Sequence, residues 1–266
     1  MTDRGEPSAS RAEARSSLEY GTKLVGQSQA RWSFSLYPEA AEGGGSFRST
    51  ARERSGGDGT APDTDRSAAD AARRARSKVR RYCAANRLNR LGTLTYAGSG
   101  NHSPLTLRTD LADFFRRLRG SVGERFPYLW APEWHPGGHG LHAHFAVGRW
   151  IARGAIEEAW GRGFVHIKLL GDLPVGSGTL GEARLAARYL AKYVGKDLAS
   201  GGQPSGLHRY EVAQGFQPRT VPITGTSADE VIGWAETYMG APPDKVWRSR
   251  DEEQWDGPPA VWASWA

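Results

Sequence analysis

Two histidines separated by a single residue, His142 and His144, stand in the apolar stretch 141–147. Side chains alternate in direction along a strand, so both imidazoles would project from one face and could reach a single metal ion. Glu133 lies on the predicted strand before them, and the Gly-rich turn 135–140 folds the chain back as a hairpin. We therefore predict that two imidazoles and one carboxylate bind Mn²⁺ or Mg²⁺ together with a phosphate.

Two tyrosines that could act as nucleophiles, Tyr189 and Tyr193, follow on a predicted helix over 179–198. Residues four apart on a helix share a face, and Lys196 is placed beside them. A phenol with a pKa near 10 is a poor nucleophile, but a nearby cation and a metal-polarised phosphate favour attack by the phenolate. The helix also carries further cations, namely Arg184, Arg188 and Lys192. A basic helix suits a surface laid against phosphates.

The same residues also have interpretations without chemistry. Paired tyrosines at this spacing can be core packing with hydroxyls at the rim, and the two histidines can be half-buried polar groups. His135 and His139 are rival ligands, but both lie in the Gly-rich turn, where side chains move freely. His166 belongs to a different predicted strand, and we expect it to be structural.

Composition points to a polyanionic partner. The 266 residues include 35 Lys and Arg against 29 Asp and Glu, and much of the excess lies in the segment 73–90. Nucleic acid is the first candidate for such a partner. The single cysteine, Cys83, excludes an intramolecular disulfide and a zinc site with several cysteines. No apolar run is long enough to cross a membrane and no signal peptide is evident, so we expect a soluble, cytoplasmic protein with no membrane partner.

Hydrophobic patterns predict a set of alternating elements. They give the order β-α-β-β-α-β-α after a first Ala/Arg-rich helix, and an antiparallel sheet with helices packed on one face. This is an α+β fold of ferredoxin-like or RRM-like kind. The predicted helices are 67–81, 107–119, 152–160 and 179–198, and the predicted strands are 91–96, 128–134, 141–147 and 164–170.

Three regions follow from the distribution of apolar residues. We expect 1–66 to be a largely disordered leader, because its segment 42–68, with Gly43–Gly45, has too few apolar groups to offset the entropy of ordering. Residues 67–217 form the folded domain. Residues 218–266 hold five of the ten tryptophans, and we expect them to pack on that domain as a C-terminal extension.

Three motifs, taken in order, give the chain a family resemblance. They are the strand 91–96, the metal motif 140–147 and the Tyr-x-x-Lys motif within 189–196. Together they resemble the HUH endonucleases, and within them the rolling-circle replication initiators (Rep proteins) of actinobacterial-type plasmids and single-stranded DNA phages. The resemblance covers about 78–217. It includes 206–213, which is similar to a downstream segment of actinobacterial plasmid Reps.

The resemblance implies roles for particular residues. Tyr193 aligns with the nicking tyrosine because Val194-Gly195-Lys196 follows it, and Tyr189 occupies a position where some members keep a glutamate and others a second tyrosine. Whether one or both tyrosines are used stays open. Ala143 is smaller than the residue usual between the two histidines.

The implied reaction is a metal-assisted transesterification on single-stranded or hairpin origin DNA. It yields a 5′-phosphotyrosine and a free 3′-hydroxyl that primes synthesis. The chain has no phosphate-binding Gly-x-x-x-x-Gly-Lys-Ser/Thr loop, so a host helicase and the host replication machinery are implied as partners.

Other functions fit parts of this pattern. A transposase of the same superfamily would use the same chemistry on the ends of a mobile element, whereas a relaxase usually has its nucleophile near the N-terminus. Two histidines and a glutamate also form the metal site of non-haem iron oxygenases, although the helical content and basic charge argue against that class. A non-catalytic DNA-binding protein with a structural metal ion is the third alternative.

Overall fold

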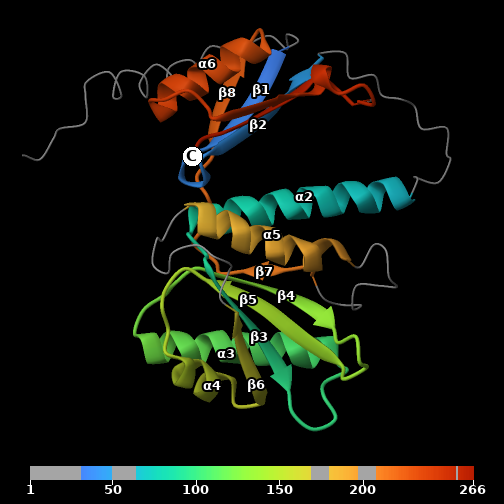
Figure 1. The fold of residues 1–266 in the computed structure, drawn as a ribbon, viewed down its shortest axis with the longest axis vertical. Coiled ribbons are helices and arrows are strands. Elements are labelled where there is room, and N and C mark those ends of the chain that lie inside the picture. Colours follow the sequence, from blue (N-terminus) through green and yellow to red (C-terminus); the bar gives the residue numbers. More distant parts are fainter. Residues whose placement is uncertain (1–30, 50–63, 169–179, 197–207, 256) are drawn as a thin grey trace, which may run out of the picture. The chain divides into compact units, whose positions relative to one another are not determined.

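The protein consists of two units, each with its own five-stranded antiparallel sheet (Figure 1). One unit comprises residues 61–218, and the other combines 1–60 with 219–266. Side chains within the helical stretches 64–70 and 193–196 are not described. The computed structural model describes residues 31–49, 64–168, 180–196, 208–255 and 257–266.

The unit of residues 61–218, hereafter the larger unit, has the predicted order of elements from β3 to α5. Its sheet runs β6-β3-β5-β4-β7, and the α+β class is confirmed. Its elements are α2 (Thr64–Ala85), β3 (Arg90–Tyr96), α3 (Pro104–Val122), β4 (Tyr128–Trp134), β5 (Leu141–Val147), α4 (Arg153–Trp160), β6 (Gly163–Lys168), α5 (Leu180–Lys196) and β7 (Glu211–Val212).

Helices cover both faces of this sheet, whereas the sequence predicted helices on one face. In Figure 1, α3 and α4 lie on one side of the sheet and α2 and α5 on the other. Phe114 and Trp160 pack against Phe145 on the first side, and Val79 and Leu190 pack with the strands on the second. The reason is that every residue of β5 is buried, so the strand has two faces to cover.

A glycine allows one large ring to lie flat on this sheet. Gly92 of β3 stands opposite Phe145 of β5, and a Cβ at Gly92 would lie 2.4 Å from the Phe145 ring. Phe145 is 1% exposed, so the ring has no free space into which it could move. The strand next to the histidines therefore needs a residue without a side chain at this point.

The second unit, hereafter the smaller unit, is built from two distant parts of the chain. Its sheet order is β8-β1-β2-β10-β9, and α6 packs on it through Val231 and Ala235, which are both fully buried. Its elements are β1 (Arg31–Tyr37), the 3₁₀ turn Pro38–Ala40, β2 (Glu42–Arg48), β8 (Val221–Gly225), α6 (Ala228–Met239), β9 (Lys245–Arg248), the 3₁₀ turn Ser249–Asp251 and β10 (Ala260–Ser264).

The prediction that 42–48 belongs to a linker is wrong. These residues form β2, which lies between β1 and β10 in the sheet. The glycines are needed there because the ring of Phe34 lies over β2, where a Cβ at Gly43 would be 2.4 Å from it. Aromatic packing across a glycine compensates for the missing side chain. The expected leader residues 1–30 and the linker residues 50–63 lie outside the described part of the chain.

The C-terminal residues complete this second sheet. β8 pairs with β1, where Trp32 stands opposite Gly225, and β10 pairs with β2, where Trp262 stands opposite Gly44. The sequence did not indicate these pairings, because each joins segments that are far apart in the chain. None of the described helices is both long and apolar enough to cross a membrane.

Candidate active site

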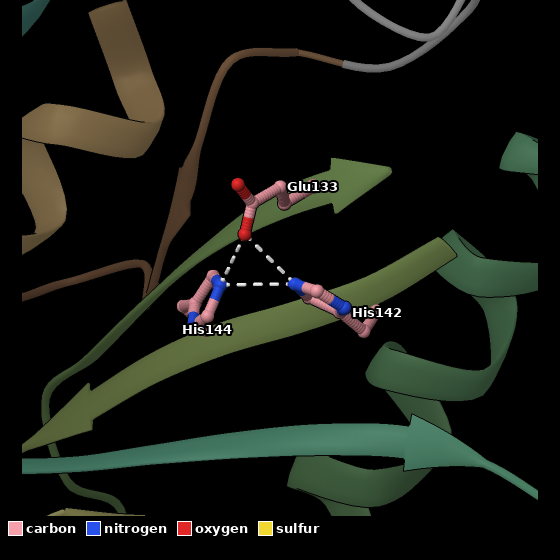
Figure 2. A group of neighbouring side chains, drawn as sticks. All are labelled: Glu133, His142 and His144. Carbon is pink, nitrogen blue, oxygen red and sulfur yellow. Dashed lines mark hydrogen bonds and ion pairs between the residues drawn. The ribbon is translucent and has the colours of Figure 1, made fainter. Parts of the chain in front are cut away.

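Three side chains on β4 and β5 converge on one point. Glu133 stands directly opposite His142 in the hairpin, and His144 lies two residues further along the same face. Glu133 Oε2 is 2.9 Å from His142 Nε2 and 2.8 Å from His144 Nε2, and the two Nε2 atoms are 3.0 Å apart (Figure 2). The exposed fractions of these side chains are only 8 to 12%. The structure thus brings together all three predicted metal ligands, hereafter the metal triad.

The donor atoms of the metal triad suit a divalent cation. A carboxylate oxygen and two imidazole nitrogens all bring lone pairs to a shared point, where only a proton or a cation can separate them. Burying such groups without a partner is costly. Within the described residues, this is the group of His, Cys, Asp and Glu side chains whose ligand atoms lie close enough to hold a metal ion.

A hydroxyl on the next strand orients one of these ligands. Thr93 of β3 stands opposite His144, and its Oγ1 is 3.0 Å from His144 Nδ1. When Nδ1–H donates to this hydroxyl, Nε2 keeps its lone pair directed at the metal triad. His142 Nδ1 is buried and has no hydrogen-bond partner in the described structure. Thr93 is a site residue that the sequence motif contained but did not identify, because its role depends on strand pairing.

Helix α5 places Tyr189 beside the metal triad. The Tyr189 ring centre is 6.3 Å from that of His144, with the two rings nearly perpendicular. Leu190 is fully buried against the sheet, so the preceding tyrosine is held at the edge of the helix contact. Lys168, at the end of β6, places Nζ 4.1 Å from the centre of the Tyr189 ring. This cation was not among the predicted site residues.

The remaining predicted residues of the nucleophile helix are placed only by the backbone. Tyr193 and Lys196 both lie in α5, one and nearly two turns after Tyr189, and their side chains lie outside the described residues. Arg188 and Lys192 are exposed on the same helix. The expected roles of Tyr193 as nucleophile and of Lys196 as its neighbouring cation therefore stay predictions.

The other histidines lie near the metal triad without joining it. His135 has its ring 5.5 Å from that of His142, but its Nδ1 accepts the Gly137 N–H at 3.0 Å within the exposed turn. His139 Nε2 is 3.0 Å from the carbonyl oxygen of Tyr96. Both rival ligands thus have other hydrogen bonds, and neither belongs to the group of converging ligand atoms.

His166 differs from its expected structural role. It is exposed on β6 and stands opposite Thr93, which also stands opposite His144 from the other side. Directly paired residues share a face of the sheet, so His166 faces the same side as the metal triad. Sequence reasoning missed this because it did not establish that β6 lies beside β3.

Positive charge and a buried thiol characterise α2. The exposed cations of this helix are Arg73, Arg74, Arg76 and Lys78. Cys83 lies on the opposite, buried side, where burial raises the pKa of its thiol far above the ordinary value. The thiol therefore stays protonated and has no role as a metal ligand or nucleophile.

One family comparison covers the site. A family model described as replication-associated protein ORF2 matches residues 89–198. The matched segment contains the metal triad and all of α5, and it supports a Rep-type replication protein. No curated protein and no solved structure matches the chain.

Proposed function

We propose that this protein initiates rolling-circle replication by nicking single-stranded or hairpin origin DNA through a tyrosine. The main support is the metal triad, which lies beside Tyr189 on a basic helix within the segment similar to replication-associated proteins. A phenol next to bound divalent metal is the constellation that phosphoryl transfer to a tyrosine requires.

The spacing of the donor atoms favours Mn²⁺ or Mg²⁺. An octahedral ion of this size binds ligands at about 2.1 Å, so two ligands at right angles are about 3.0 Å apart. Tetrahedral zinc ligands at a similar bond length would be about 3.3 Å apart. The distances within the metal triad, 2.8 to 3.0 Å, agree with the octahedral spacing. When bound, the ion would polarise the scissile phosphate and stabilise its developing negative charge.

The proposed step exchanges one phosphate ester for another. A tyrosine Oη attacks the phosphorus, the Oη–P bond forms, and the P–O3′ bond breaks. The phenol loses its proton, and a proton is taken up by the departing 3′-oxygen. The products are a 5′-phosphotyrosine and a 3′-hydroxyl that primes synthesis by the host machinery. We assign Tyr193 as nucleophile from its motif, with Tyr189 as a second tyrosine.

Positive charge around the phenols serves this step. Lys168 over the Tyr189 ring would stabilise a phenolate there, and exposed Arg188 and Lys192 would attract the DNA backbone. An iron oxygenase is disfavoured, because such sites usually lie in a double-stranded β-barrel and the metal triad lies on a sheet with the linear order β6-β3-β5-β4-β7.

The decisive experiment looks for a covalent adduct. The full chain is incubated with Mn²⁺ and 3′-labelled single strands that tile the replicon encoding it, because a 5′-phosphotyrosine retains the labelled 3′ side. We expect a labelled protein band on a denaturing gel that disappears with EDTA and with Tyr193→Phe. Tyr37→Phe, in the smaller unit, is the matched control and should leave the band unchanged.

Each other outcome identifies a different function. A band that persists in Tyr193→Phe but disappears in Tyr189→Phe would make Tyr189 the nucleophile. Adducts formed with mobile-element ends but with no plasmid origin would indicate a transposase. If the wild-type protein binds the strands but never forms a band, nicking is refuted and a DNA-binding protein with a structural metal replaces it.

A further inference from the structure

A large apolar side chain lies exposed on the edge of the larger sheet. Phe164 of β6 is 69% exposed, while its neighbour Val165 is 6% exposed and packs in the core on the other face. β6 is the edge strand of the sheet order β6-β3-β5-β4-β7. An exposed aromatic group on an edge strand is a liability for aggregation, so its presence calls for a binding role.

Strand pairing aligns this side chain with the metal triad. Phe164 stands opposite Thr95, Thr95 stands opposite His142, and His142 stands opposite Glu133. All four side chains therefore face the same side of the sheet. Neighbouring strands are about 4.8 Å apart, which puts Phe164 about 10 Å from His142 along this row. A molecule held at the metal triad can therefore extend across β3 to the Phe164 ring.

Two polar groups continue the same face of β6. His166 and Lys168 follow Phe164 at alternate positions, and both are exposed. His166 is aligned with His144 through Thr93, and Lys168 contacts the Tyr189 ring. The strand thus presents an aromatic ring, an imidazole and an ammonium group in sequence. This combination suits a polymer with flat aromatic groups and a phosphate backbone.

We infer that the face of β6 formed by Phe164, His166 and Lys168 binds single-stranded DNA beside the metal triad, and that one base stacks on Phe164. This inference rests on the proposed function and adds a binding surface to it. Stacking on an exposed aromatic ring needs an unpaired base, because bases within a duplex are already stacked. Phe164 would therefore make the site selective for single strands and would fix the position of the strand relative to the metal triad.

Binding without cleavage tests this surface separately from the chemistry. The affinity of the full chain for dye-labelled oligo(dT) is measured by fluorescence anisotropy in EDTA, which prevents nicking. We expect Phe164→Ala to weaken binding about ten-fold or more, as loss of one base stack does, and Phe164→Trp to retain it. Trp150→Ala is the matched control, because Trp150 is 70% exposed but belongs to no strand of the sheet.

A second measurement maps the contact directly. Oligo(dT) containing 5-iododeoxyuridine is irradiated with the wild-type protein in EDTA, and the crosslinked peptide is identified by mass spectrometry. We expect the crosslink on the peptide that contains Phe164, and its loss in Phe164→Ala. Thermal unfolding of that variant should match the wild type, because the removed side chain is exposed.

The outcomes separate this inference from the proposed function. Wild-type affinity in Phe164→Ala, together with a crosslink elsewhere, would overturn the β6 surface, while an adduct formed by the wild type would leave the nicking function standing. A wild-type protein that binds oligo(dT) through Phe164 but forms no adduct would support the surface and refute nicking. Failure of the wild type to bind any single strand would refute both.

Discussion

The two sheets of this protein share a construction but differ in what they carry. Both are five-stranded and antiparallel, and in each a buried phenylalanine ring lies over a glycine of the neighbouring strand, Phe145 over Gly92 and Phe34 over Gly43. In the described part of the chain, the cluster that could hold a metal ion lies on the larger sheet. Architecture alone therefore does not give the chemistry, which depends on the few polar side chains that strand pairing brings into one row.

The largest expected difference between the sheets concerns the metal. His142→Ala removes one of three buried ligands, so we expect Mn²⁺ binding to fall at least 100-fold and adduct formation to be abolished. His208→Ala, an exposed histidine outside the metal triad, is the control. Isothermal titration with Mn²⁺ measures the first effect. Undiminished binding in His142→Ala would mean that the ion sits elsewhere.

Substitution of the two glycines separates the stability of the sheets. Gly92→Ala and Gly43→Ala each put a Cβ 2.4 Å from a buried ring, which should cost about 1–3 kcal/mol of unfolding free energy in its own unit. Gly44→Ala is the matched control, because its Cβ would meet its nearest neighbour at an ordinary 3.5 Å. Hydrogen exchange of peptides from each sheet shows where protection is lost.

The two glycine variants should also differ in function. Gly92→Ala disturbs β3 and Phe145 next to the histidines, so it should weaken Mn²⁺ binding as well as stability. Gly43→Ala should leave Mn²⁺ binding unchanged. If Gly43→Ala impaired Mn²⁺ binding as strongly, the two sheets would have to be one functional body, contrary to our comparison.

A single hydroxyl should tune the metal triad. Thr93→Val removes the partner of His144 Nδ1 while keeping the shape of the side chain, so we expect about a ten-fold loss of Mn²⁺ affinity with little change in stability. Thr95→Val, two residues along the same face, is the control. Equal losses in both variants would show that packing, and not the hydrogen bond, sets the affinity.

The smallest expected effects concern acid stability, where each unit has one carboxyl with a lowered pKa. In the larger unit, hydrogen bonds from Arg162 and then Arg116 lower the pKa of Asp113. In the smaller unit, hydrogen bonds from Thr226 lower the pKa of Glu230. Such a group stabilises the fold above its ordinary pKa, and the contribution is lost as the pH falls through the folded value.

Neutral variants of these carboxyls test the assignment. Because both groups are exposed, Asp113→Asn and Glu230→Gln should each lower Tm at pH 7 by only about one degree, and by less at pH 3. Thermal scans at both pH values, combined with hydrogen exchange, assign each change to its unit. A larger loss at pH 3 than at pH 7 would contradict the direction of the pKa shifts.

Local patterns were enough to predict the metal triad. Glu133, His142 and His144 lie within one hairpin, so alternation along two strands and one turn placed them together. The bounds of β4 and β5 agree with the prediction for the same reason. Lys168, Thr93 and Phe164 could not be assigned, because their relation to the metal triad depends on which strands are neighbours.

The smaller sheet shows the opposite case. Its glycine-rich strand β2 looks like a linker in isolation, because the ring that covers Gly43 comes from another strand. The strands that flank β1 and β2 on their outer sides, β8 and β10, lie far away in the sequence. Composition rules assume that a segment must provide its own apolar surface, and here the partners supply it.

The pairing of β1 with β8 also sets an order of events during synthesis. About 190 residues separate these strands, so a ribosome adding roughly 5–20 residues per second makes β1 wait on the order of ten to forty seconds for its partner. A two-stranded hairpin alone is marginally stable, whereas every strand of the larger sheet has already been synthesised by residue 212. The nascent chain can therefore complete the unit with the metal triad first, while β1 and β2 depend on chaperones or on their own glycine-rich, weakly aggregating character until translation ends.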